Sequence, residues 1–121
     1  MARVNIPVTL LTDDSPFVDP SASEVTADPT NDHSFLNNGR TILQVRNTAG
    51  SSKTFDVVTP NTVDGLAVSD RTVTVAAGKT VYVGPFPRSI YSGTDQDNSG
   101  ERCLVNVPAA ETDLRFKAYR I

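Results

Sequence analysis

Apolar and polar residues alternate along many short segments of this chain, and this pattern constrains the fold more than any other feature. Beyond residue 40 the alternating segments are 41–47, 54–59, 71–75, 80–83, 103–107 and 114–119. Successive side chains of a strand point to opposite faces, so alternation indicates strands with one apolar and one polar face. With the segments nearer the N-terminus this makes about eight strands, and no segment keeps the period of a helix.

Turn-forming residues separate these segments and indicate how the strands connect. Asn38-Gly39, residues 49–52, the loop at 60–65 and Ala77-Gly78-Lys79 each stand between alternating segments. Many short strands joined by such turns are typical of a sandwich or a barrel, and a polar outer face favours antiparallel pairing. We therefore predict an all-β, antiparallel β-sandwich, Ig-like or jelly-roll-like, as a single domain over residues 1–121.

The opening segment, residues 2–11, alternates as well. Val4, Ile6, Val8 and Leu10 share one face of the predicted strand. Pro7 has no backbone N–H to donate to a sheet. We therefore expect this strand at the edge of a sheet or against a neighbouring subunit.

Residues 12–38 differ in character, since they are acidic and rich in proline, serine and threonine. Such a long irregular segment within a compact domain is usually functional or disordered. Two interpretations remain: a solvated surface loop that holds one short strand, or an arm laid on a partner and anchored by Phe17 and Phe35. On the second interpretation the segment is mobile in the free protein and ordered in an assembly.

Composition and charge exclude several classes of partner. The net charge is -3, which gives no reason to expect attraction to nucleic acid or to an anionic membrane surface. The apolar stretches are far too short to span a bilayer, and the N-terminus lacks the apolar core of a secretory signal. We expect a protein made in the cytoplasm. Its low apolar content and lack of tryptophan indicate a thin core that partner subunits help to cover.

Few residues suggest chemistry. His33 is the single histidine and has no nucleophile motif around it, so an ordinary surface histidine is the favoured interpretation over a Ser-His-Asp site. Cys103 is the single cysteine, which excludes an internal disulfide, and its position on a strand predicts a buried, unreactive thiol. We expect no catalytic residue, no cofactor and no enzymatic activity.

Residues 95–100 resemble the first half of a calcium-binding loop, with oxygen-bearing side chains at alternate positions and Gly100 at the sixth. Asn106 stands where such a loop needs a bidentate glutamate, and strands rather than helices are predicted on both sides. Glu101 remains as a substitute ligand. A polar β-turn is the favoured interpretation, and no metal site is expected.

A resemblance to known proteins adds to these inferences. It extends from Ala2 to Ile121 and is strongest in residues 38–50, 64–68, 71–75, 77–80 and 83–87, with turns such as Asn47-Thr48-Ala49-Gly50 and Ala77-Gly78-Lys79-Thr80. These stretches resemble small β-sandwich capsid decoration (cement) proteins and related head proteins of tailed phages that infect actinobacteria. The resemblance implies a virion protein that binds the major capsid protein on the outer shell as a homo-oligomer.

Other functions stay open for such a fold. A carbohydrate- or receptor-binding adhesion module is one alternative, although the chain has no tryptophan and three tyrosines for stacking on sugars. A head–tail connector or tail component is another. On the last predicted strand, Arg115, Lys117 and Arg120 project either towards acidic partners or simply into solvent.

Overall fold

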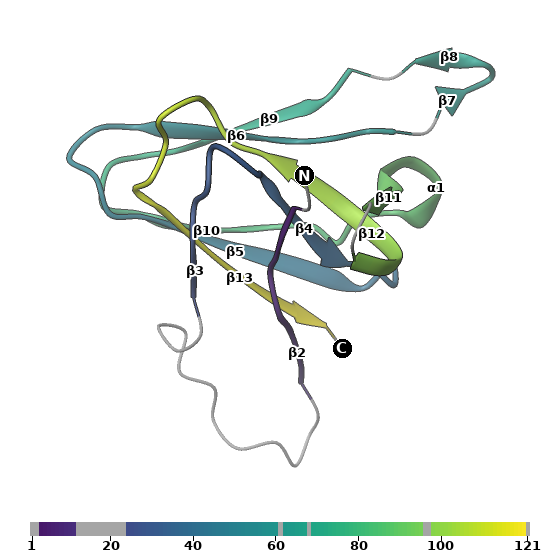
Figure 1. The fold of residues 1–121 in the computed structure, drawn as a ribbon, viewed down its shortest axis with the longest axis horizontal. Coiled ribbons are helices and arrows are strands. Elements are labelled where there is room, and N and C mark those ends of the chain that lie inside the picture. The colour runs from purple at the N-terminus through teal and green to yellow at the C-terminus, as the bar shows by residue number, and fades with distance from the viewer. Residues whose placement is uncertain (1–2, 12–23, 61, 68, 96–97, 121) are drawn as a thin grey trace.

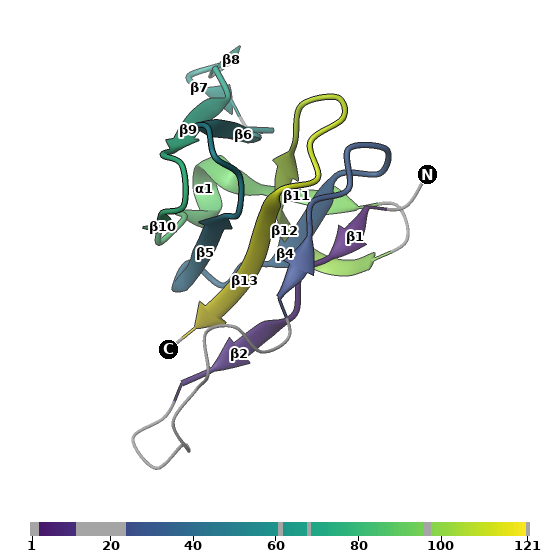
Figure 2. The ribbon, with the colours of Figure 1, turned by 90° about the vertical axis from the view of Figure 1, so that its left-hand side faces the viewer.

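The computed structural model describes residues 3–11, 24–60, 62–67, 69–95 and 98–120. The chain is nearly all β, and its two main sheets pack against each other without closing into a barrel (Figures 1 and 2). The predicted all-β sandwich is therefore confirmed. One short helix, α1 (Arg88–Tyr91), lies in the described residues.

The first sheet has six strands. Its order is β1 (Val4–Asn5), β4 (His33–Leu36), β12 (Asn98–Asn106), β6 (Lys53–Val57) and β9 (Arg71–Val75), with β11 (Ser92–Asp95) also paired to β12. Beyond β6 the chain continues into a small hairpin, β7 (Thr62–Val63) and β8 (Leu66–Ala67), before it returns as β9.

The second sheet has five strands and contains the C-terminal strand at its centre. Its order is β10 (Thr80–Val83), β5 (Thr41–Asn47), β13 (Leu114–Arg120) and β2 (Val8–Leu10), with β3 (Val25–Thr26) also paired to β13. β5 and β13 pair over their whole length, from Leu114 opposite Asn47 to Arg120 opposite Thr41.

Both sheets are mixed, which differs from the antiparallel prediction. β1 runs parallel to β4, and β2 runs parallel to β13. The cause lies in the N-terminal segment, which pairs with one sheet before Pro7 and with the other after it, so one predicted strand becomes two short ones. Both lie at the ends of their sheets, as Pro7 predicted.

The core lies between the two sheets. Most of its side chains are those that alternation placed inward, whereas Phe35 and Phe86 were not predicted in this way. Its largest fully buried members include four phenylalanines, and the others are aliphatic: Phe35, Phe55, Phe86, Phe116, Ile6, Leu43, Leu114, Val45, Val57 and Val75. The rings of Phe35 and Phe86 lie 5.6 Å apart, and those of Phe55 and Phe116 lie 5.7 Å apart in an edge-on arrangement. Such tilted pairs add to the energy of area burial.

The acidic segment at 12–38 is only partly as predicted. Residues 24–38 belong to the sandwich, since β3 and β4 pair with β13 and β12. Phe35 is completely buried in the core and is therefore not the anchor of an arm. One short strand was expected in this segment, but its position at β4 was not predicted, because His33 and Ser34 are polar yet buried. Residues 12–23, with the proposed anchor Phe17, lie outside the described residues.

The outer face of the second sheet is less exposed to solvent than predicted. Gln44 and Lys117, both expected to face solvent, are 2% and 4% exposed. The Lys117 ammonium lies 5.5 Å from the centre of the Tyr119 ring, an arrangement in which an aromatic face stabilises a cation. Lys117 is therefore not an exposed cation for a partner, whereas Arg115 and Arg120 are partly exposed.

Candidate functional site

His33, predicted to be a surface residue, is fully buried on β4. Its ring lies 5.0 Å from that of Phe116, and its Nε2 accepts a hydrogen bond from the backbone N–H of Asp28 at 2.8 Å. Nε2 is thus the unprotonated nitrogen, and the proton of the neutral ring is on Nδ1. The histidine secures the turn between β3 and β4.

Burial also determines the charge of His33. Loss of hydration lowers the pKa of the imidazole, and this effect exceeds the opposing influence of the Val4 carbonyl and of Asp28 and Asp32. The ring is therefore neutral at physiological pH. Since Nε2, the basic nitrogen, already accepts a hydrogen bond from a backbone N–H, His33 is not positioned to act as a general base on a neighbouring hydroxyl.

Cys103 is fully buried on β12, as predicted. Burial raises the pKa of its thiol to about 12, so the thiolate is essentially absent at neutral pH. A thiol that stays protonated is a poor nucleophile and a poor metal ligand. Cys103 acts as a small apolar side chain of the core.

The segment that resembles half a calcium loop forms the end of a β-hairpin, in which Asp95 of β11 lies opposite Asn98 of β12. Residues 96 and 97 and the side chains of 95–99 lie outside the described residues. Glu101, the substitute ligand, is engaged elsewhere, because its Oε2 accepts a hydrogen bond from Arg88 Nε at 2.6 Å. No cluster of three metal-ligating side chains occurs in the part of the chain that the structure describes.

The Arg88–Glu101 ion pair lies between two open depressions of about 460 and 450 Å³. One is lined by Leu36, Asn37, Asn38 and Arg120, and the other by Pro60, Ser92, Gly93 and Thr94. The hydrogen bond from Arg88 lowers the pKa of Glu101, but both side chains are more than half exposed, where ion pairs contribute little. Depressions this open keep a ligand in contact with water and suit a surface contact better than a reaction.

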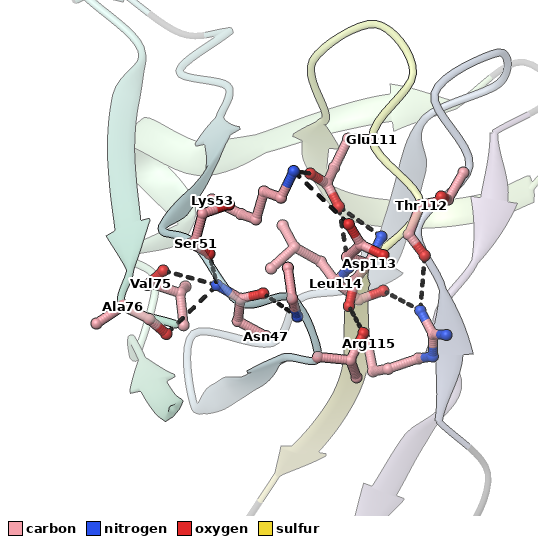
Figure 3. Close-up of polar contacts among 12 residues, drawn as sticks. Asn47, Ser51, Lys53, Val75, Ala76, Glu111, Thr112, Asp113, Leu114 and Arg115 are labelled. Carbon is pink, nitrogen blue, oxygen red and sulfur yellow. Dashed lines mark hydrogen bonds and ion pairs between the residues drawn. The ribbon is translucent and has the colours of Figure 1, made fainter. Parts of the chain in front are cut away.

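A buried polar cluster has a structural role (Figure 3). The Asn47 side-chain amide donates to the carbonyls of Ser51 at 2.9 Å and Val75 at 3.0 Å, which connects β5 to the end of β9. Nearby, Glu111 accepts hydrogen bonds from the backbone N–H groups of Asp113 and Leu114. These contacts satisfy backbone groups at strand ends and fix the turn before β13.

The feature that best suits recognition is a projecting hairpin, residues 62–67, which we call the arm. Figure 1 shows it extending beyond the two sheets, with β7 and β8 at its tip. Asp64 and Gly65 form its turn with φ angles of 51° and 76°, the left-handed pair that favours a tight two-residue hairpin. Leu66, directly after the turn, is 72% exposed.

The base of the arm is well defined. Asp70 Oδ1 accepts a hydrogen bond from the backbone N–H of Thr59 at 3.0 Å, and Val58 N donates to the Leu104 carbonyl at 2.9 Å. Residues 60–65 were predicted only as a loop. The signal was present, because Asp-Gly between apolar residues is a strong local indication of a hairpin.

Comparisons with protein-family models, curated proteins and solved structures gave no match to this chain. None of the described helical residues belong to a segment long and apolar enough to cross a membrane.

Proposed function

We propose that this protein is a structural virion protein, a capsid decoration protein that binds the major capsid protein on the outer shell as a small homo-oligomer. The resemblance of residues 38–50 and 64–87 to phage decoration proteins suggested this role. The arm is the observation that carries it, since a hairpin that projects from a rigid sandwich and ends in an exposed leucine is suited to docking on another protein. The sandwich supports the arm and performs no reaction.

The free energy gained when the arm docks can be estimated from the burial of Leu66. Full burial of a leucine side chain is worth about 1.5–3 kcal/mol, which corresponds to roughly ten- to a hundredfold in affinity. A shell offers many identical sites, so modest contacts of this kind suffice when a homo-oligomer engages several at once.

The test is to add purified protein to shells that lack it and to image the mixture by electron cryomicroscopy. We expect saturable density at symmetry-related positions on the outer surface, with the arm against the major capsid protein. Leu66→Ser should weaken binding roughly ten- to a hundredfold. Leu10→Ser is the matched control, because Leu10 is also an exposed leucine, at 44%, but lies on β2 away from the arm.

Other results would replace this proposal with one of its alternatives. Density only at the portal vertex or on the tail would identify a connector or tail component. Binding to glycans without binding to shells would identify an adhesion module, in which Tyr82, 65% exposed on β10, is the aromatic residue to test. Equal affinity of Leu66→Ser and the wild type for shells would show that the arm is not part of the interface.

A further inference from the structure

Two strands that end their sheets lie on one side of the molecule. β9 is the last strand of the six-stranded sheet, and β10 is the last strand of the five-stranded sheet among the residues described. A tight turn joins them, in which Lys79 N donates to the Ala76 carbonyl at 3.1 Å. Figure 2 shows β9 and β10 together on the side of the molecule opposite β1.

Apart from the charged Arg71 at its start and the Asn47 contact with the Val75 carbonyl at its end, β9 has, in the part of the chain that the structure describes, none of the features with which proteins usually protect a sheet edge. Its sequence, Arg71-Thr72-Val73-Thr74-Val75, contains no proline and no charged residue after its first position. It pairs with β6 at all five residues without a bulge. A regular, β-branched edge strand of this kind presents unpaired backbone groups to another strand.

The strand is also incompletely covered. Val73 and Val81, the inward-facing residues at the middle of β9 and β10, pack against the core but remain partly exposed, whereas Val75 and Val83 are buried. Another strand placed beside β9 would cover Val73 and extend the same core. The end of β9 is held in position, since the Asn47 side-chain amide donates hydrogen bonds to the carbonyls of Val75 and Ala76.

The sequence of β9 is complementary to itself in the antiparallel direction. Centred on Val73, this register places Val73 opposite Val73 of a second copy, Thr72 opposite Thr74, and Arg71 opposite Val75. Thr–Thr and Val–Val are favourable cross-strand pairs, and no like charges meet. Antiparallel pairing also places the base of the arm near the far end of β9 in the second copy. The exposed Asp70 at that base then approaches the exposed Lys79 in the turn after β9.

We propose that β9 is the self-association edge of this protein, and that two copies pair their β9 strands antiparallel about Val73 in solution. The dimer joins two six-stranded sheets into one continuous sheet with a two-fold axis at Val73. The two arms then extend in opposite directions and leave both Leu66 side chains exposed. The inference specifies the homo-oligomer of the proposed function and rests on it to that extent, but the pairing needs no shell and involves a different surface from the arm.

Crosslinking through an introduced cysteine tests the register. In Val73→Cys the two thiols face each other across the axis, so copper phenanthroline should convert most of the protein to a covalent dimer that dithiothreitol reverses. Ala77→Cys is the control, because Ala77 is exposed two residues beyond β9 and away from the axis. The wild type, with only the buried Cys103, should not crosslink.

Sedimentation equilibrium tests the association itself. The wild type should be a dimer at micromolar concentration, and Thr72→Lys/Thr74→Lys should raise the dissociation constant at least tenfold, because lysines then face lysines across the axis. Thr30→Lys/Thr112→Lys adds the same charge at exposed positions away from β9 and should leave the constant unchanged.

A monomeric wild type at 200 micromolar (about the concentration at which weak contacts appear) would overturn the proposal. So would a dimer that the β9 lysines leave intact, or one that crosslinks as well through Ala77→Cys as through Val73→Cys. Shell binding through the arm is measured separately, so failure of either proposal leaves the other standing.

Discussion

The two flanks of the sandwich are built by different means. On the N-terminal flank, β1, β2 and β3 are two or three residues long, and Pro7 separates β1 from β2. On the opposite flank, β9 and β10 are five and four residues long and pair without interruption. Short strands make few ladder bonds, so the N-terminal flank needs other contacts to hold it.

Arginine side chains supply those contacts. Arg3 Nη1 donates to Asn106 Oδ1 at 2.7 Å and to two backbone carbonyls, which fastens β1 to the sheet. Arg102, only 4% exposed, donates to Ser34 Oγ at 2.9 Å and to Asn5 Oδ1. Side-chain hydrogen bonds therefore hold the short strands of the N-terminal flank in place. The strands of the opposite flank are regular and leave a sheet edge at which a further strand can pair.

The largest expected effect is at the apolar anchor of the N-terminal flank. Ile6 is completely buried between β1 and β2. Ile6→Ala should lower the free energy of unfolding by about 2–5 kcal/mol, measured by urea denaturation, because it leaves a cavity in the core. A loss below about 1 kcal/mol would mean that this flank contributes little to the folded state.

The next effect concerns the arginine that closes the same flank. Arg102→Met keeps an unbranched apolar side chain and removes the hydrogen bonds to Ser34 and Asn5. We expect a loss of about 2–3 kcal/mol in the free energy of unfolding, the usual contribution of hydrogen bonds to a charged group. Hydrogen exchange should increase at residues 4–6. Unchanged exchange there would contradict a closing role for Arg102.

The pH dependence of stability reports on His33, next to this flank. Burial lowers the pKa of His33 in the folded state. Below about pH 6.5, therefore, the imidazole binds a proton in the unfolded chain but stays neutral in the folded chain. Stability is therefore full above that pH and falls as the pH decreases, by up to about 1.4 kcal/mol per pH unit. His33→Gln, which removes the single histidine, should abolish the slope between about pH 5 and 6.5. A persistent slope would assign it to other groups.

The smallest effect is expected on the open flank. Val73 is only partly buried in one copy. Val73→Ala should cost about 1 kcal/mol or less in the free energy of unfolding at dilute concentration, where monomers dominate. At higher concentration the loss should increase, because the dimer contact is weakened too. A concentration-independent loss would count against pairing through β9.

Local patterns in the sequence were enough to predict the strands that form the centre of the sandwich. Period-two alternation in 41–47, 54–59 and 114–119 selected the buried residues Leu43, Phe55 and Phe116 correctly. Pro7 predicted an edge position, and Cys103 was correctly read as a buried thiol. These inferences succeed because alternation, proline geometry and turn residues act within a few residues along the chain.

Long-range contacts decided the rest. His33 and Lys117 are polar, and the hydrogen bond from Asp28 and the ring of Tyr119 help to offset the cost of burying them. The parallel pairing of β1 and β2 and the openness of β9 depend on which strands become neighbours. Periodicity acts locally, so the amino-acid sequence was sufficient for the central strands and their inward faces. The burial of polar residues and the open edge at β9 follow from the tertiary structure, since both depend on partners distant in sequence.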